Sequence, residues 1–266
     1  MRKINKIKLF INDNEKSRVV AKDLEMELKK YGFKIVNKNF DLGISIGGDG
    51  SFLRMVKDTN FNSDIYYIGI NAGTLGFLQE IDICKCADFV KRLNTDDYKL
   101  EDINIEETKI ITEDKIYKFN SLNEVVVRNI DFSTLKLKVY VDNELLENFT
   151  GDGLLISTST GSTAYNMSFG GSIIYNTLNT LSITPIAPLN NKVYKTLVNS
   201  VIIPSDKKIT LKPYKNFNDV FISADGEQKK INDIIKIEVG IDKNTIKCIR
   251  MNDFHFIKVI NDKILA

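Results

Sequence analysis

The chain has 266 residues, of which 43% are hydrophobic, enough for one large domain or two moderate ones with buried cores. Its 37 Lys and Arg residues nearly balance its 35 Asp and Glu residues, and the basic residues are scattered, which excludes the charge footprint of a duplex nucleic-acid-binding protein. The three cysteines, Cys84, Cys86 and Cys248, have the spacing of neither a zinc site nor a disulfide framework.

Cysteines of this kind fit a reducing compartment, so we expect a cytoplasmic protein. The apolar run at residues 7–11 is too short, and too interrupted by Lys8, for a signal peptide, and no later run approaches the length of a membrane span. The single histidine, His255, excludes every mechanism that needs two histidines. Acid–base chemistry is therefore left to carboxylates, Lys, Tyr or water.

The first hundred residues alternate between apolar runs and helical patterns. Apolar residues at Val19, Val20, Leu24 and Leu28 have helical spacing, and Gly32 ends that pattern. We expect strands at residues 7–11, 33–36, 42–46 and 65–70, and helices at residues 14–31 and 52–57. Strands that alternate with helices predict a parallel sheet covered on both faces, so residues 1–100 should form a Rossmann-like α/β domain.

Beyond residue 100 the pattern changes to short runs with a two-residue period, separated by turn sequences such as Asp-Asn and Ala-Asp-Gly, which predicts antiparallel strands. They are expected at residues 108–112, 116–120, 135–141, 154–158, 201–204 and 208–211. We interpret residues 101–245 as a C-terminal antiparallel β-sandwich domain. Residues 246–266 are expected to return to the N-terminal domain.

The most informative motif is Gly-Gly-Asp-Gly-Ser at residues 47–51, directly after the strand expected at 42–46. Glycines let backbone N–H groups approach an anion closely, so Gly47, Gly48 and Gly50 around Asp49 indicate a phosphate loop with a built-in carboxylate. Loops at the carboxyl ends of parallel strands are where α/β sheets bind ligands. The alternative interpretation is an ordinary Asp-Gly turn.

Two further segments carry residues suited to a ligand. In residues 71–78, Gly73 and Gly76 follow the next expected strand, so this segment is a second strand-to-loop corner like residues 47–51. Two such corners of a parallel sheet can line the same crevice, with Phe77 as an apolar wall. The alternative is a capped turn with a core Phe. Asn123 and Glu124 precede a valine run and offer donors and acceptors for sugar hydroxyls or base edges, although a strand-entry turn has the same composition.

The richest segment runs from residue 151 to residue 171. It begins with Gly-Asp-Gly at 151–153, and residues 160–168 gather hydroxyl groups and Tyr165 in an expected loop. The hydroxyls suit phosphates or ribose, and Tyr165 offers an aromatic face to a base. The alternative is a solvated Ser/Thr-rich turn.

Taken in order, these segments resemble the NAD kinase family, of the ATP- or polyphosphate-dependent bacterial type, over most of the chain. Each piece is weak by itself, and their joint occurrence in this order is specific. The matching pieces are residues 47–51, residues 71–78, Asn123 with Glu124, residues 151–153, residues 160–165 with Ser168, and Pro-Ile-Ala-Pro at 185–188.

The resemblance implies transfer of the γ-phosphoryl group of ATP to the 2′-hydroxyl of the adenosine ribose of NAD, giving NADP. Asp49 matches the position of the proton acceptor, and Gly47, Gly48 and Gly50 match the phosphate loop. The positions that match NAD or nucleotide contacts are Asp49, Gly50, Arg54, Asn123, Glu124, Asp152, Thr163, Ala164, Tyr165, Asn166, Ser168 and Ala187.

The resemblance also implies a divalent metal, Mg²⁺, with no side-chain ligand assigned, and a homodimer or homotetramer. NAD and ATP are the expected partners, and neither nucleic acid nor a membrane is expected. An ordinary aspartate, with a pKa of about 3.9, is a weak base toward a sugar hydroxyl. Asp49 would therefore act by position, because loose phosphoryl transfer needs orientation of the attacking oxygen more than early loss of its proton.

Two departures limit what the resemblance assigns. Many members of the family place Arg before the Gly-Asp-Gly, where this chain has Thr150. Residues 225–228, Asp-Gly-Glu-Gln, differ from the family's Asp-Gly-Gln by Glu227. No ligand contact is assigned to either segment.

Two other functions compete with this one. Lipid kinases of the diacylglycerol or sphingosine type share the Gly-Gly-Asp-Gly loop but follow it at once with Asn-Glu-Val, whereas Asn123 and Glu124 come more than seventy residues after Asp49 here. A non-catalytic dinucleotide sensor with the same fold is the other hypothesis. Asp49 counts against it, because a carboxylate beside an anionic ligand weakens binding.

Overall fold

The computed structural model describes residues 3–73, 76–129, 133–214 and 220–265. The chain divides into two compact units, Met1–Ile103 with Asn244–Ala266, and Asn104–Lys243. Two long strands, β6 (Lys99–Thr112) and β17 (Ile234–Arg250), each have residues in both units. None of the helices in the described part of the chain is long and apolar enough to cross a membrane.

The remaining elements are as follows. The helical elements are α1 (Glu15–Lys30), α2 (Asp49–Asp58), the 3₁₀ turn η1 (Ile83–Lys85), α3 (Cys86–Asn94), the 3₁₀ turn η2 (Thr160–Thr163), α4 (Tyr165–Ser168), α5 (Phe256–Ile260) and the π-helical turn η3 (Asn261–Leu265). The other strands are β1 (Lys6–Ile11), β2 (Lys34–Ile35), β3 (Leu42–Gly47), β4 (Tyr66–Asn71), β5 (Ile81–Asp82), β7 (Ile116–Ser121), β8 (Glu124–Asn129), β9 (Leu135–Val141), β10 (Glu144–Gly151), β11 (Gly153–Thr158), β12 (Thr180–Ile186), β13 (Val201–Pro204), β14 (Ile209–Pro213), β15 (Val220–Ala224) and β16 (Glu227–Ile231).

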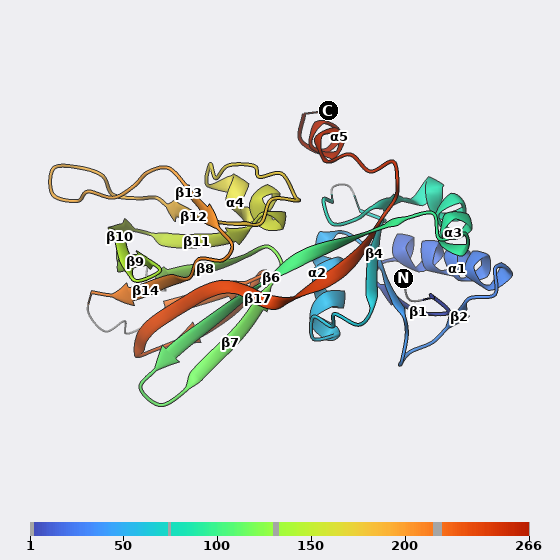
Figure 1. Cartoon of the computed structure of the whole chain (residues 1–266), viewed down its shortest axis with the longest axis horizontal. Helices are drawn as coiled ribbons and strands as arrows, with labels where there is room; N and C mark the ends of the chain where they lie inside the picture. The colour runs from blue at the N-terminus through green and yellow to red at the C-terminus, as the bar shows by residue number, and fades with distance from the viewer. Residues whose placement is uncertain (1–2, 74–75, 130–132, 215–219, 266) are drawn as a thin grey trace. The chain divides into compact units, whose positions relative to one another are not determined.

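The first unit contains a parallel sheet in the order β2-β1-β3-β4-β17 (Figure 1). Leu42, Ile44 and Ile46 of β3 face a core shared with α1 and α3. On the other face, the sulfur of Met55 in α2 lies 3.1 Å from the position of a Cβ at Gly43. Helices therefore cover both faces, and the predicted N-terminal α/β domain is confirmed.

Local sequence explains where the first helices begin. The side chain of Asn14 accepts a hydrogen bond from the backbone N–H of Ser17 at 2.8 Å and so caps α1. Helix α2 starts at Asp49, three residues earlier than the sequence predicts, because Gly48 is extended at the N-cap and a carboxylate in the first turn suits the helix dipole. The expected loop at Asp49 and Gly50 is therefore the first turn of a helix.

The second unit contains two antiparallel layers. One is a six-stranded sheet in the order β13-β12-β11-β8-β15-β16, and the other contains β10, β9, β14 and β17, with β6 and β7 joined through β17. Val125 and Ile156 from the first sheet share one core with Leu137, Leu211 and Ile237 from the second. This is the predicted antiparallel β-sandwich.

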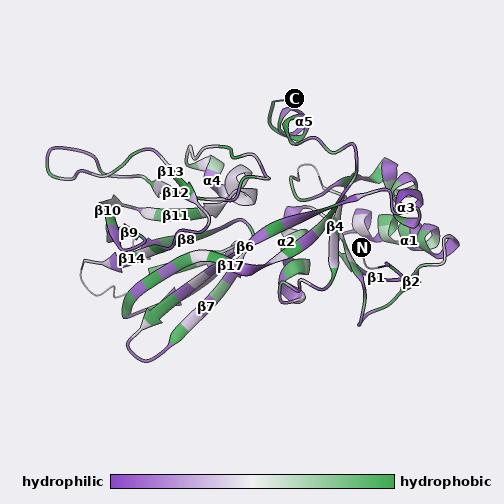
Figure 2. Ribbon diagram, viewed as in Figure 1, coloured by the Kyte–Doolittle hydropathy of each residue, from purple (hydrophilic) through white to green (hydrophobic). Residues whose placement is uncertain are grey.

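Hydropathy alternates along the strands of this second layer. Figure 2 shows purple and green alternating along β6, β7 and β17, and the burial of β6 alternates in the same way near its end. One face of each strand meets the core and the other meets solvent, as expected for an antiparallel sheet. The sequence predicts only the last five residues of β6, because the charged residues before them obscure the alternation of apolar and polar residues.

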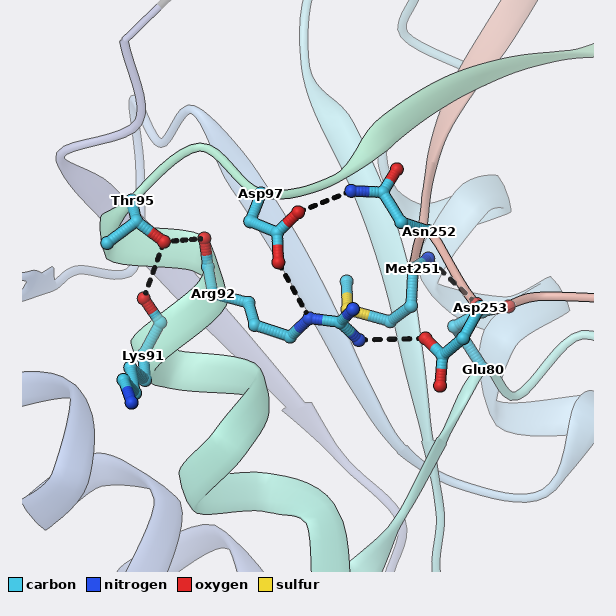
Figure 3. Close-up of polar contacts among 8 residues, drawn as sticks. All are labelled: Glu80, Lys91, Arg92, Thr95, Asp97, Met251, Asn252 and Asp253. Carbon is cyan, nitrogen blue, oxygen red and sulfur yellow. Dashed lines mark hydrogen bonds and ion pairs between the residues drawn. The ribbon is translucent and has the colours of Figure 1, made fainter.

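The segment after β17 is held to the first unit by charged side chains. The side chain of Arg250 is 11% exposed and forms ion pairs with Glu101 and, at 3.1 Å, with Glu80. Glu80 also accepts the backbone N–H of Met251 at 2.9 Å. In α3, Arg92 bridges Asp97 and Asp253 at 3.0 and 2.8 Å (Figure 3). These contacts thus hold residues 250–253 against Glu80, Arg92 and Glu101 of the first unit.

We predict that Arg250→Met destabilises the protein by about 3–5 kcal/mol, because it leaves Glu80 and Glu101 without their largely buried cation. Urea unfolding of both proteins measures the difference. Arg18→Met is the control, because Arg18 pairs with Asp13 on the exposed surface of α1 and its loss should have no measurable effect. Equal stability of the Arg250 variant and the wild type would contradict the structural importance of this pair.

Candidate functional site

In the first unit, the glycine motif forms the corner between β3 and α2. Strand β3 ends at Gly47, Gly48 is the N-cap of α2, and Asp49 begins the helix. A Cβ at Gly47 would lie 2.9 Å from the Cβ of Ser51, so only glycine fits there without a shift. The N-terminus of α2 directs unpaired backbone N–H groups outward, which is a common way to bind an anion.

The carboxylate of Asp49 is held by a distant segment. Its Oδ2 accepts the backbone N–H of Phe77 at 2.8 Å, and its Oδ1 accepts that of Leu78 at 2.9 Å. Burial raises the pKa of Asp49 above its ordinary value, while these two N–H groups and the charge of Lys263 act to lower it. Asp49 is thus a fixed carboxylate with a stronger affinity for a proton than an exposed aspartate.

The second glycine corner lies against the first, as the sequence predicts. A Cβ at Gly73 would lie 3.6 Å from the Cα of Gly48, and a Cβ at Gly76 would lie 2.9 Å from Oδ1 of Asp49. Gln79 closes the corner by donating from Nε2 to the carbonyl of Gly48 at 2.6 Å. The residues that surround Asp49 therefore come from two strand ends of one parallel sheet.

Arg54 stands one turn along α2 from this corner. Its Nη2 donates to Oδ1 of Asn12 at 2.8 Å and to Oγ of Ser51 at 3.1 Å. Both partners are neutral, and among the described residues no carboxylate pairs with Arg54 within 4.0 Å. Its positive charge is therefore available to an anion near the start of α2.

In the second unit, Glu124 begins β8 and Asn123 directly precedes it, and a carboxylate holds the backbone at this point. Asp225 accepts the N–H groups of Leu122 and Asn123, each at 2.8 Å. Asp225 has a φ of +47° in the turn between β15 and β16, and its own N–H donates to the carbonyl of Glu124 at 3.1 Å. The sequence assigned nothing to Asp225, although its Asp-Gly turn between expected strands was a signal that a hairpin brings it there.

The Ser/Thr-rich segment packs on the same corner. The backbone N–H of Thr158 donates to the carbonyl of Asn123 at 2.9 Å, and the backbone N–H of Tyr165 donates to the carboxyl group of Glu124. A Cβ at Gly161 would overlap the carbonyl of Asn123 and lie 2.5 Å from its Cα. Glycine at 161 is therefore what allows these two backbones to touch.

Three carboxyl groups lie at this corner: Glu106 and Glu124 are buried, and Asp225 is partly buried. Burial, and then the charge of Asp225, raises the pKa of Glu124 to about 8. Burial raises the pKa of Asp225 to about 6 and that of Glu106 well above its ordinary value. Glu106 is fully buried, and its Oε1 accepts hydrogen bonds from Ser121 at 3.1 Å and Thr108 at 3.4 Å. At neutral pH Glu124 therefore retains a proton that an exposed glutamate lacks.

Residues 163–168 form the end of η2 and the short helix α4, where the sequence predicted a loop. Ala164, Tyr165 and Ser168 reach the surface, and Tyr165 is 42% exposed. Thr163 is buried, and its hydroxyl is 3.5 Å from the carbonyl of Thr160.

Asn166 differs from its neighbours because it is fully buried. Its Nδ2 donates to the carbonyls of Ser162 and Ser172 at 3.2 and 3.3 Å, and its Oδ1 accepts from the hydroxyl of Thr184 at 2.6 Å. Both ends of the amide are used inside the fold. In this structure Asn166 supports the turn instead of presenting its amide to a ligand.

Asp152 and Ala187 lie together at the junctions of β10 with β11 and of β12 with the following loop. The backbone N–H of Asp152 donates to the carbonyl of Ile186 at 3.0 Å, and its side chain is exposed. Ala187 is exposed with a φ of +43°, a strained value for alanine that the surrounding backbone imposes. Thr150 is buried, and its N–H donates to the hydroxyl of Thr196 at 3.2 Å.

The structure therefore forms two groups of the candidate residues, each within one unit. Gly47, Gly48, Asp49, Gly50 and Arg54 gather at the start of α2. In the second unit, Asn123 and Glu124 contact the segment from residue 160 to residue 168. Across the described ranges of the chain, no group of three or more His, Cys, Asp or Glu side chains converges to hold a metal ion.

Comparison with known proteins gives matches over both units. Residues 3–98 match the model of the ATP-NAD kinase N-terminal domain, and residues 122–250 match that of the ATP-NAD kinase C-terminal domain. The NAD kinase of Finegoldia magna is 38% identical, with 97% of each chain covered. NAD kinase 2 of Bacillus subtilis is 32% identical, with 93% of each chain covered.

Two solved structures are similar in fold. Yeast NADH kinase complexed with NADH has a TM-score of 0.86 at 20% identity, covering 100% of this chain and 88% of that one. An NAD kinase from Archaeoglobus fulgidus in complex with ATP has a TM-score of 0.75 at 19% identity, covering 98% of each chain. At these identities the similarity supports the fold of the chain.

We predict that Gly161→Ala destabilises the protein by about 2–3 kcal/mol, because the new methyl group meets the backbone of Asn123, which has no room to move. Thermal and urea unfolding measure the effect. Gly240→Ala in β17 is the matched control, because a Cβ there meets nothing within 4 Å. Similar stability of the two variants would show that the contact at Gly161 is not tight.

We also predict that Glu124→Gln stabilises the protein only at high pH. The pKa of Glu124 is about 8 in the folded protein against an ordinary 4.5, so its ionisation costs stability progressively as the pH rises between these values. Above pH 8 the variant should be more stable by on the order of 1–3 kcal/mol, and the advantage should vanish at the acidic end.

The measurement is urea unfolding of the wild type and the variant across this pH range. Glu144→Gln, at an exposed position of β10, is the control and should show no such trend. An advantage that does not change with pH would mean that Glu124 is not a buried titrating group.

Proposed function

Because the chain belongs to the NAD kinase family, we propose that it transfers the γ-phosphoryl group of ATP to the 2′-hydroxyl of the adenosine ribose of NAD, giving NADP. The family makes the chain a phosphotransferase that phosphorylates NAD. It excludes the lipid-kinase hypothesis and the non-catalytic sensor. The observation that supports the detailed reaction best is the fixed carboxylate of Asp49 at the start of α2.

In this proposal Asp49 accepts the proton of the attacking ribose hydroxyl. Each of its oxygens accepts one backbone N–H, which leaves lone pairs on both for the substrate. The two bonds fix the direction of the carboxylate, and burial raises its pKa, so that it is a better base than an exposed aspartate. In a loose transition state the orientation of the hydroxyl is the larger contribution.

The donor phosphates are placed at the N-terminus of α2 in this proposal. Gly47, Gly48 and Gly50 keep this backbone free of side chains. Arg54, whose hydrogen-bond partners Asn12 and Ser51 among the described residues are neutral, supplies a positive charge. Mg²⁺ is the proposed metal. With no cluster of side-chain ligands among the described residues, the ion would be held mainly by phosphates and water, as Mg²⁺ often is at such sites, and would neutralise phosphate charge.

The proposed NAD site uses residues of the second unit. Asn123 and Glu124 are suited to ribose or base groups, and Glu124, with a pKa of about 8, both donates and accepts at neutral pH. The remaining proposed contacts are Asp152, Thr163, Ala164, Tyr165, Ser168 and Ala187. Asn166 belongs to the site as a positioning residue, because its amide is fully engaged within the turn.

The remaining proposals concern the cellular location of the protein and its oligomeric state. We propose a cytoplasmic enzyme, in line with the free thiols of Cys84, Cys86 and Cys248, which localisation of a tagged copy tests. We also propose a homodimer or homotetramer on the family resemblance. Sedimentation of the purified protein tests this, and a monomer at working concentrations would contradict it.

We predict that Asp49→Asn lowers NADP formation from ATP, Mg²⁺ and NAD by about 100-fold or more, the usual contribution of a general base. Its dissociation constant for NAD should change by less than about threefold, because the lost group acts on the reacting hydroxyl. NADP production and calorimetric binding of NAD measure the two quantities. Equal turnover by the variant and the wild type would remove Asp49 from the proposed role.

A control is needed because asparagine presents an amide group to the N–H of Phe77 or Leu78 and so disturbs the corner. Gln79→Met disturbs the same corner by removing the hydrogen bond to Gly48, and it keeps the carboxylate. We expect this variant to lose stability but to retain most of the turnover. A loss as large as that of Asp49→Asn would assign the effect to the shape of the corner instead of the carboxylate.

A further inference from the structure

A cavity of about 240 Å³ lies on the six-stranded sheet of the second unit. It is smaller than the 300–1,000 Å³ or so that is usual for a whole small-molecule ligand, so it suits one part of a dinucleotide. Its walls come from β8, β15, β16 and α4, with the Asp152 corner at one side. The residues that line it are Val126, Arg128, Asn129, Ser133, Asp152, Tyr165, Phe221, Ser223 and Gln228.

The sheet register directs Arg128 over this surface. Arg128 is paired with Gly153 of β11 on one side and with Phe221 of β15 on the other. A Cβ at Gly153 would lie 2.7 Å from Cγ of Arg128, so the side-chain stem of Arg128 occupies the space that the glycine leaves. The absence of a side chain at 153 thus lets the arginine stem lie flat beside the Gly-Asp-Gly corner.

The charge of Arg128 has no counterpart in the described structure. Among the described residues it makes no hydrogen bond and no ion pair within 4.0 Å, and it is half-buried. It is also the only cationic side chain among the described residues that line the cavity. A guanidinium in this setting favours a planar or tetrahedral anion that accepts more than one of its N–H groups, as a phosphate does.

The other lining residues complement the rest of a nucleotide. Asp152 is exposed and suits sugar hydroxyls, and the rings of Tyr165 and Phe221 are 42% and 36% exposed and suit the face of a base. A base, a ribose and a phosphate thus each have a matching group in one small cavity. A free inorganic anion would leave the faces of Tyr165 and Phe221 unused.

We propose that Arg128 binds a phosphate of the dinucleotide substrate, and that this cavity holds the nucleoside attached to that phosphate. The inference rests on the proposed function, because Asp152 and Tyr165 belong to the proposed NAD site. It adds a specificity residue to that site: Arg128 distinguishes a phosphate-bearing ligand from the corresponding nucleoside.

The test uses two variants of the full-length protein and a control. Arg128→Gln keeps the stem over Gly153 and removes the charge, and Arg128→Lys keeps the charge as a single point. Arg18→Gln, on the exposed surface of α1, removes a positive charge from a residue that is distant from Arg128 in the sequence. Thermal unfolding of each variant first establishes that it is folded.

We expect Arg128→Gln to raise the KM for NAD by about tenfold or more, the usual loss of a charge-assisted hydrogen bond, with kcat within about twofold. Arg128→Lys should recover part of the affinity, and Arg18→Gln should change neither constant. An unchanged KM in a folded Arg128→Gln protein would overturn the inference.

A second measurement separates the phosphate contact from general damage. AMP is compared with adenosine, and nicotinamide mononucleotide with nicotinamide riboside, by calorimetric binding to the wild type and to Arg128→Gln. In one of the two pairs the variant should weaken binding of the phosphate-bearing member by about tenfold and leave the nucleoside unchanged. Equal effects on both members of each pair would overturn the inference.

The two proposals fail in different ways. If the wild type makes NADP but neither measurement depends on Arg128, the inference fails and the proposed function stands. If the wild type makes no NADP but binds the mononucleotide with an Arg128-dependent affinity, the proposed function fails and the phosphate contact stands.

Discussion

Two partly buried carboxylates, Asp49 and Asp225, each accept two successive backbone N–H groups from a segment far away in sequence. Asp49 holds Phe77 and Leu78 at 2.8 and 2.9 Å, and Asp225 holds Leu122 and Asn123 at 2.8 Å each. Loop backbone that is shielded from water needs partners for its polar groups, and a carboxylate supplies two acceptors in a fixed direction. In the first unit this contact fixes the carboxylate of Asp49, and in the second it fixes the backbone of Asn123.

The burial of these carboxylates and of Glu124 explains the electrostatics of the site. A carboxylate that is withdrawn from water resists ionisation, so burial raises the pKa of Asp49, of Glu124 and of Asp225. This costs stability progressively as the pH rises from the ordinary pKa of the carboxyl group to its raised value in the folded protein, because the folded state must then carry a poorly solvated charge. Glu124 and Asp225, with pKa values of about 8 and about 6, therefore exchange protons near neutral pH, and the raised pKa of Asp49 makes it a better base than an exposed aspartate.

The arrangement of the candidate residues also requires that backbone segments approach one another closely, which glycine allows. Gly161 lets the Ser/Thr-rich segment touch the backbone of Asn123, and Gly153 makes room for the stem of Arg128. Both glycines belong to motifs that resemble those of a nucleotide-binding family. Both positions need glycine because neighbouring strands and turns pack closely there. This packing fixes the buried Asn123 and leaves Tyr165 and Arg128 accessible to solvent.

The sequence by itself determined the fold class of each unit, several of its strands and helices, and the family, but it did not predict α3, β12 or β17. The α/β alternation and the two-residue periods depend on neighbouring residues, so strand β13 (Val201–Pro204) and the parallel sheet around β3 were predictable from local pattern. Only the tertiary structure decided that Asp225 holds Asn123, that Asn166 is buried, and that Asp49 is clamped by Phe77 and Leu78. Asp225 and Asn123 are 102 positions apart, and hydrogen bonds and burial over such separations depend on how the sheets pack, which no local pattern records.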